Sequence, residues 1–155
     1  MTKPELIQQL PGVCYGQAHV GQASAVLVFV AKKDCVAAGD KFIALRQLKQ
    51  YAPPYAEMIE GFMSGIKASG GSKEWCKRQA YIALGFGLAA AAEHKVASCP
   101  MEGFNGEGLG KLVGVKDDEE VCVVLALGRM PADDAAYTGG YPQWRHDKSA
   151  FFERI

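Results

Sequence analysis

The sequence has no surplus of either charge and no long hydrophobic run. Lys plus Arg and Asp plus Glu number 17 each among 155 residues, so no overall field favours nucleic acid or an anionic membrane. The longest apolar run, Tyr81 to Ala92, is far shorter than the roughly 20 residues that span a bilayer. The first residues lack the basic and apolar segments of a signal peptide. We expect a soluble, cytoplasmic protein that binds neither nucleic acid nor membrane.

The cysteines form no pattern typical of a disulfide framework or a zinc site. The sequence has no CxxC pair and no Cys/His pair at zinc spacing, and its five cysteines are Cys14, Cys35, Cys76, Cys99 and Cys122. We therefore expect reduced thiols and no metal. Free cysteine is usually a small buried hydrophobic residue, and this interpretation is favoured over a reactive thiol even for Cys99.

Several catalytic and nucleotide-binding motifs are also missing. The sequence contains no GxGxxG after a predicted strand, no P-loop, no GxSxG and no HExxH. The common dinucleotide-binding and hydrolase classes therefore have no support.

The composition is that of a globular protein. Hydrophobic residues make up 49% and charged residues 22%, and the length suits a single domain over residues 1–155. Two valine-rich apolar runs, Ala23 to Ala31 and Glu119 to Gly128, predict strands covered on both faces. We expect the first of them to be a central strand of a sheet.

The helical segments surround these strands. A short helix capped by Thr2 is predicted to open the chain and to end at Pro11-Gly12. Residues 41–66 have helical spacing that Pro53-Pro54 interrupts, which predicts two helices. Residues 73–95, with Ser72 as the expected cap, form a helix with almost no polar face, so we expect it to be buried in the core, at a subunit interface, or both.

The stretch CPMEGFN, residues 99–105, follows that helix and a strand-like VASCP. A short helix ending at Gly114 is predicted next. Backbone N–H groups at the end of an element lack intrachain partners and suit an anion or the electronegative edge of a ring. From these residues alone, an ordinary turn in which Gly103 supplies a positive φ is the favoured alternative.

The tail, residues 130–155, is polar and ends in the apolar FFERI. It has too little apolar surface for its own core, so we expect it to lie as an arm across this chain or another. Arg145 within it is a candidate for bidentate contact with a phosphate, although a solvated charge is the favoured alternative.

Read in order, three segments resemble the nitroreductase family of FMN-dependent NAD(P)H oxidoreductases. They are EWCKRQAYIALGFGLAAAAEHKVASCPMEGFN, LGKLVGV and EEVCVVLALGRMPADD. The resemblance implies an α+β fold, a three-layer sandwich in which helices flank a mixed β-sheet. It also implies an intertwined homodimer with its flavin sites at the interface, in which the C-terminal arm, 130–155, is exchanged between subunits.

The resemblance also implies which residues bind FMN. Pro100, Met101, Glu102 and Gly103 match the family's turn against the flavin, where backbone amides face the N5 and O4 edge. Arg145 matches an arginine that holds the phosphate, and Gln143 stands where the family has a lysine. Gln17 is the candidate side chain at the pyrimidine edge, and His19 lies where some members have a lysine. No side chain is implied as an obligate acid or base, and no metal is implied.

The function that follows is an FMN-dependent NAD(P)H oxidoreductase. By this resemblance it reduces nitroaromatics, quinones or similar small-molecule acceptors by ping-pong hydride transfer. Family members usually begin with a further segment carrying an Arg-x-Ser phosphate motif, which this sequence lacks. The alternative is therefore a catalytically silent dimeric scaffold, or a fragment, that binds flavin weakly or not at all.

Overall fold

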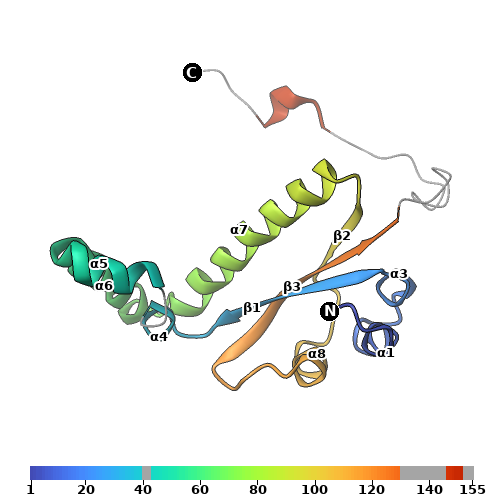
Figure 1. Ribbon diagram of the computed structural model, residues 1–155, viewed down its shortest axis with the longest axis horizontal. Helices are drawn as coiled ribbons and strands as arrows, with labels where there is room; N and C mark the ends of the chain where they lie inside the picture. The colour runs from blue at the N-terminus through green and yellow to red at the C-terminus, as the bar shows by residue number, and fades with distance from the viewer. Residues whose placement is uncertain (40–42, 130–145, 152–155) are drawn as a thin grey trace.

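The computed structural model describes residues 1–39, 43–129 and 146–151 (Figure 1). Its centre is a three-stranded sheet in the order β1-β3-β2, made of β1 (Ala25–Lys32), β2 (Ala97–Met101) and β3 (Glu119–Gly128). Both strand pairs are antiparallel, with a register shift at Phe29/Val30 in β1. Among the described residues no parallel pair occurs, so the parallel pairing of a mixed sheet is not found there.

The strand predictions are confirmed, but their places in the sheet differ from expectation. The middle strand is β3, which begins and ends as predicted and is buried from Cys122 to Ala126. β1 lies at an edge of the described sheet, and its Leu27 remains 41% exposed. An apolar sequence run shows that a strand is packed, but it cannot show which neighbour pairs with it.

One face of the sheet is covered by the long helix α7 (Ser72–Glu93), with α4 (Cys35–Gly39) and α6 (Pro53–Ala68) beside its N-terminal end (Figure 1). α5 (Ile43–Tyr51) precedes α6. As predicted, the two-proline break separates the helices, and Pro53 and Pro54 open α6. The core on this face contains Ala31, Cys35, Met63, Cys76, Leu84, Cys122, Val123 and Leu125.

The other face of the sheet is covered by short helices (Figure 1). These are α1 (Pro4–Ile7), α2 (Leu10–Val13), α3 (Ala18–Gly21) and α8 (Gly106–Val113). Their core contains Ile7, Leu10, Cys14, Val20, Val26, Met101, Leu109, Val124 and Ala126. Helices on both faces of a sheet confirm the α+β, three-layer class. Of the arm at 130–155, residues 146–151 are described and include a 3-10 turn, Lys148–Ala150.

Three predicted helix boundaries are wrong. Lys3, not Thr2, precedes α1, and Pro11 and Gly12 lie inside α2 instead of ending a helix. Ser72 is the first residue of α7, and its hydroxyl accepts the backbone N–H of Cys35 at 2.7 Å. That contact spans 37 residues, so local sequence had no means to show it.

The apolar character of α7 is only half explained by the described fold. Leu84 and Ala91 are buried against the sheet, as expected. On the opposite side Ile82 is 56% and Phe86 is 74% exposed, so burial on all sides is wrong for the single chain.

Within the described residues, no helix is both long and apolar enough to cross a membrane.

Candidate functional site

The predicted CPMEGFN site consists of the end of β2 and the connection from it to α8; we call residues 100–105 the β2–α8 turn, of which Pro100 and Met101 are the last residues of the strand. Pairing with β3 ends at Met101 opposite Val124. Beyond it, Phe104 N–H donates to the Glu102 carbonyl at 2.9 Å, and Asn105 N–H donates to the Val13 carbonyl at 2.7 Å. Within the described residues, the backbone N–H groups of Glu102 and Gly103 donate to no acceptor, so both are available to an external one.

Gln17, the residue before α3, forms a hydrogen bond to the backbone of this turn. Its Nε2 donates to the Gly103 carbonyl at 2.7 Å and to the Cys14 carbonyl at 3.1 Å. The two hydrogens of the amide are thereby used within the chain. The structure thus brings Gln17 to the turn, with its amide nitrogen bonded to backbone.

Glycine is needed at position 103 because the neighbouring Gln17 amide leaves no room for a Cβ. The glycines with positive φ in the described residues are Gly16, Gly70 and Gly114, so the favoured interpretation of Gly103 as a positive-φ turn glycine is wrong. A Cβ on Gly103 would instead lie 2.7 Å from Gln17 Nε2. The absence of a side chain allows the close approach of the Gln17 amide.

The turn leads into a well-capped helix. Asn105 precedes α8, and its Oδ1 accepts the Gly108 N–H at 2.9 Å. Gly114 ends the helix, as the sequence predicts, and it adopts the left-handed conformation at φ 75°. Such caps fix both ends of a short helix, so the residue after the turn is anchored independently of β2.

Tyr81 of α7 holds the turn from the opposite face. Its hydroxyl donates to the Glu102 carboxylate at 2.5 Å, with the Cys122 carbonyl 3.5 Å away. Burial of the phenol, together with this hydrogen bond to Glu102, raises the pKa of Tyr81 to about 12. The hydroxyl therefore remains a donor throughout the neutral range.

His19 and Cys99 lie beside the turn on the face of the short helices. His19 Nε2 is 3.2 Å from the Met101 sulfur and 3.8 Å from Cys99 Sγ. Cys99 is exposed, so the expectation that it is buried is wrong, whereas the other four cysteines are buried. Burial raises the pKa of the Cys14, Cys76 and Cys122 thiols.

The structure therefore brings together one part of the predicted site. Pro100, Met101, Glu102, Gly103 and Gln17 lie in or against a single turn. The predicted phosphate ligands Gln143 and Arg145 lie outside the described residues. Among those described, no group of three or more His, Cys, Asp or Glu side chains is arranged to hold a metal ion.

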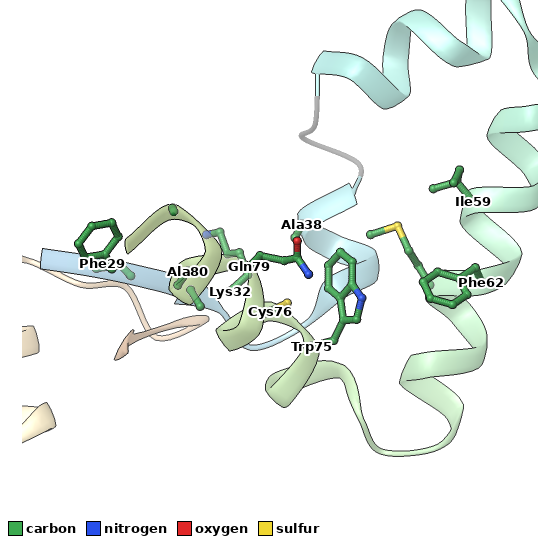
Figure 2. Close-up of a pocket in the computed structure, with 13 residues that line it drawn as sticks. Phe29, Lys32, Ala38, Ile59, Phe62, Trp75, Cys76, Gln79 and Ala80 are labelled. Atoms are coloured by element: carbon green, nitrogen blue, oxygen red, sulfur yellow. The ribbon is translucent and has the colours of Figure 1, made fainter. Parts of the chain in front are cut away.

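A separate apolar cavity of about 520 Å³ opens between β1, α4, α6 and α7. In Figure 2, Trp75 lies between Gln79 of its own helix and Ile59 and Phe62 of α6. The polar side-chain groups among the residues that line the cavity are those of Gln79 and Lys32 and the Trp75 indole N–H, and the Lys32 ammonium is already bonded to Asp118 and Glu119. No residue of the β2–α8 turn lines this cavity, and it lacks the convergent polar groups that orient a bound cofactor.

The contact between Tyr81 and Glu102 does not follow from the sequence pattern alone. The pattern places Tyr81 on the apolar stripe of its helix and gives its hydroxyl no partner. The acidic side chain in the matched turn, Glu102, is the signal that could have indicated a partner for this hydroxyl.

Comparison with known proteins identifies the family. The sequence model described as the nitroreductase family matches residues 2–129. A protein of Thermus thermophilus named NADH dehydrogenase is 29% identical over 143 residues, which are 92% of this chain and 66% of that protein. A Staphylococcus saprophyticus protein, provisionally named as an NAD(P)H nitroreductase, is 26% identical over 138 residues, 80% of this chain and 63% of that protein. The chain thus spans about two thirds of the length of these relatives.

Solved structures share the fold. A nitroreductase family protein from Streptococcus pneumoniae superposes with a TM-score of 0.79 at 11% identity, covering 99% of this chain and 76% of that one. A nitroreductase-type protein from Exiguobacterium sibiricum, described as a complex with FMN, gives a TM-score of 0.72 at 17% identity, covering 99% of this chain and 73% of that one. The family match over most of the chain and the shared architecture agree: this chain belongs to the nitroreductase family.

Proposed function

We propose that the chain is the flavin-binding part of an FMN-dependent NAD(P)H oxidoreductase. The observation that carries this proposal is the pair of backbone N–H groups, of Glu102 and Gly103, without an acceptor in the described residues. Adjacent N–H donors at the end of a strand suit the electronegative edge of a flavin ring, where negative charge develops on reduction. Pro100 and Met101 are proposed to contact the same cofactor.

The residues present fit that role because the turn is fixed from three sides. Gln17 holds the Gly103 carbonyl, Val13 holds the Asn105 N–H, and Tyr81 holds the Glu102 carboxylate. A donor pair that is fixed before binding stabilises developing charge without a cost of reorganisation. Gln17 acts on FMN through the position of Gly103 in this proposal, and its Oε1 is left to contact the pyrimidine edge. Arg145 and Gln143 are proposed for the phosphate.

When bound, FMN supplies hydride transfer in two half-reactions, taking hydride from NAD(P)H and passing it to an acceptor such as a nitroaromatic or a quinone. The chain's own contribution is binding, orientation and the N–H donors. No side chain of the turn is positioned as an obligate proton donor. The proposed ping-pong reaction therefore depends on the cofactor and on two substrates that bind at the same place one after the other.

The proposed functional unit is a homodimer. Ile82 and Phe86 expose large apolar surfaces on one side of α7, and a Cβ added at Gly85 between them would meet no atom within 4 Å. An exposed apolar stripe that includes a small residue is typical of a helix that packs closely against a partner. Exchange of the 130–155 arm remains part of this proposal.

The test is a titration of the purified chain with FMN, followed by NADH or NADPH. The proposal expects saturable quenching of flavin fluorescence, and bleaching of the flavin absorbance on addition of a reduced nicotinamide. Gly103→Ala is expected to weaken FMN binding at least tenfold, whereas Gly106→Ala, whose added Cβ meets no atom within 4 Å, is the matched control and keeps the affinity.

The alternative function, a silent dimeric scaffold, is distinguished in the same experiment. A chain that is dimeric by light scattering but retains no FMN at 100 µM would contradict the oxidoreductase proposal and support the scaffold. Binding of FMN that Gly103→Ala leaves unchanged would contradict the assignment to the β2–α8 turn.

A further inference from the structure

We infer that Tyr81 is a positioning residue for flavin reduction: by holding the Glu102 carboxylate toward α7, it keeps that negative charge away from the edge to which the Glu102 and Gly103 N–H groups donate. The consequence for reduction rests on the proposed function. The positioning itself concerns the chain alone and is tested separately.

The direction of the Glu102 side chain follows from the strand that precedes it. Side chains alternate between the faces of a strand, and Met101 is buried in the core on the side of the short helices. The next side chain, Glu102, extends to the opposite face, where α7 lies (Figure 1). There its Oε1 accepts the Tyr81 hydroxyl at 2.5 Å.

Tyr81 is suited to this role by its own surroundings. Tyr81 is 37% exposed, and the Cys122 carbonyl of β3 lies 3.5 Å from its hydroxyl. Within the described residues no lysine or arginine forms an ion pair with Glu102, and Tyr81 is the donor recorded for its carboxylate. Loss of this hydroxyl therefore frees the carboxylate to move.

The electrostatic consequence depends on distance. Hydride transfer to a flavin adds negative charge at the edge that the two N–H groups are proposed to face. A free carboxylate on the same residue opposes that charge more strongly the closer it comes, and a hydrogen bond from a neutral donor both fixes its place and offsets part of its charge. Tyr81 thus favours reduced over oxidised FMN without touching the cofactor.

The test uses Tyr81→Phe, which keeps the ring and removes only the hydroxyl. In the FMN-loaded chain, the preference for reduced over oxidised FMN is expected to fall about tenfold, which lowers the two-electron midpoint potential by about 30 mV. The potential is measured by equilibrium titration against a reference dye. Tyr55→Phe, at an exposed tyrosine of α6, is the matched control and leaves the potential unchanged.

A second pair of variants separates charge from packing. Glu102→Gln removes the negative charge, so Tyr81→Phe in that background is expected to leave the potential unchanged, a full loss of the single-variant effect. An equal shift of the potential in both backgrounds would overturn the inference, because it would mean that Tyr81 acts through packing alone. No shift in either would overturn it as well.

The apo chain supplies the measurement that does not need FMN. Side-chain 13C relaxation at Glu102 Cγ is expected to give a lower order parameter in Tyr81→Phe than in the parent chain, because the carboxylate loses its hydrogen bond. An unchanged Glu102 side-chain order parameter would overturn the positioning role. If no variant binds FMN, the proposed function fails, and the relaxation data still decide whether Tyr81 positions the Glu102 carboxylate.

Discussion

The contact between Gly103 and Gln17 gives the sharpest stability prediction. Gly103→Ala places a Cβ 2.7 Å from Gln17 Nε2, a separation at which something must shift. The neighbouring turn backbone is fixed by Val13 and by the cap of α8, so the Gln17 side chain is expected to move. Its 2.7 Å hydrogen bond to the Gly103 carbonyl is then lost.

The magnitude follows from the groups involved. A neutral hydrogen bond contributes about 1 kcal/mol net, and leaving a partly buried carbonyl unpaired costs a further 1–3 kcal/mol, roughly. Alanine offsets about 0.4–1 kcal/mol of this by reducing the entropy of the unfolded chain, because φ at residue 103 is not positive. We expect a net loss of about 1–3.6 kcal/mol, which lowers Tm by roughly 2–14 °C for a chain of this length.

A double-mutant cycle tests the cause. Gln17→Ala removes the atom that the new Cβ meets, so the two substitutions together are expected to cost about 1 kcal/mol less than the sum of their separate effects. Gly106→Ala, with open space around its Cβ, is expected to leave the free energy of unfolding unchanged or slightly higher. Urea unfolding monitored by circular dichroism measures all four variants. Additive costs, or equal effects of Gly103→Ala and Gly106→Ala, would refute the steric reasoning.

Three further predictions concern other parts of the chain. Cys99 is exposed and the other cysteines are buried, so brief iodoacetamide treatment of the native chain is expected to add one adduct by mass spectrometry, and a second fast adduct would contradict the burial. Phe86→Arg is expected to convert dimer to monomer in light scattering, while the exposed Tyr15→Arg control stays dimeric; a dimeric Phe86→Arg would remove α7 from the interface. Lys32 holds the pKa of the Glu119 carboxyl below its ordinary 4.5 through a hydrogen bond, so the stability from this pair is present above that pH and is lost as the pH falls. Unfolding of Lys32→Met is therefore expected to depend less on pH below 4.5, and equal acid sensitivity would contradict the pairing.

The elements that the sequence predicts well are those decided by local chemistry. β3 is a continuous apolar run closed by charges and glycine, and its bounds are as predicted. Pro53 opens α6 because its ring suits a first helical turn. Gly114 ends α8 in a conformation that glycine adopts without steric cost.

The wrong predictions concern residues whose contacts are set by another residue far away in the sequence. The Ser72 hydroxyl accepts the Cys35 backbone N–H instead of capping its own helix. Position 103 requires glycine because Gln17, 86 residues earlier, lies against it. Tyr81 and Glu102 meet only when α7 packs over the sheet. Of the candidate site, the position of the turn was predictable from its residues and the family resemblance, whereas the contacts that fix it required the fold.

The Glu102 and Gly103 N–H groups are proposed to bind FMN, and a 15N–1H NMR titration of the chain with FMN observes those two groups themselves. We expect saturable shift changes that are largest at the amides of Glu102 and Gly103, and much smaller at Gly114, at the far end of α8. Saturable FMN binding that leaves those two amides unmoved, or the absence of any shift at 1 mM FMN, would contradict this assignment.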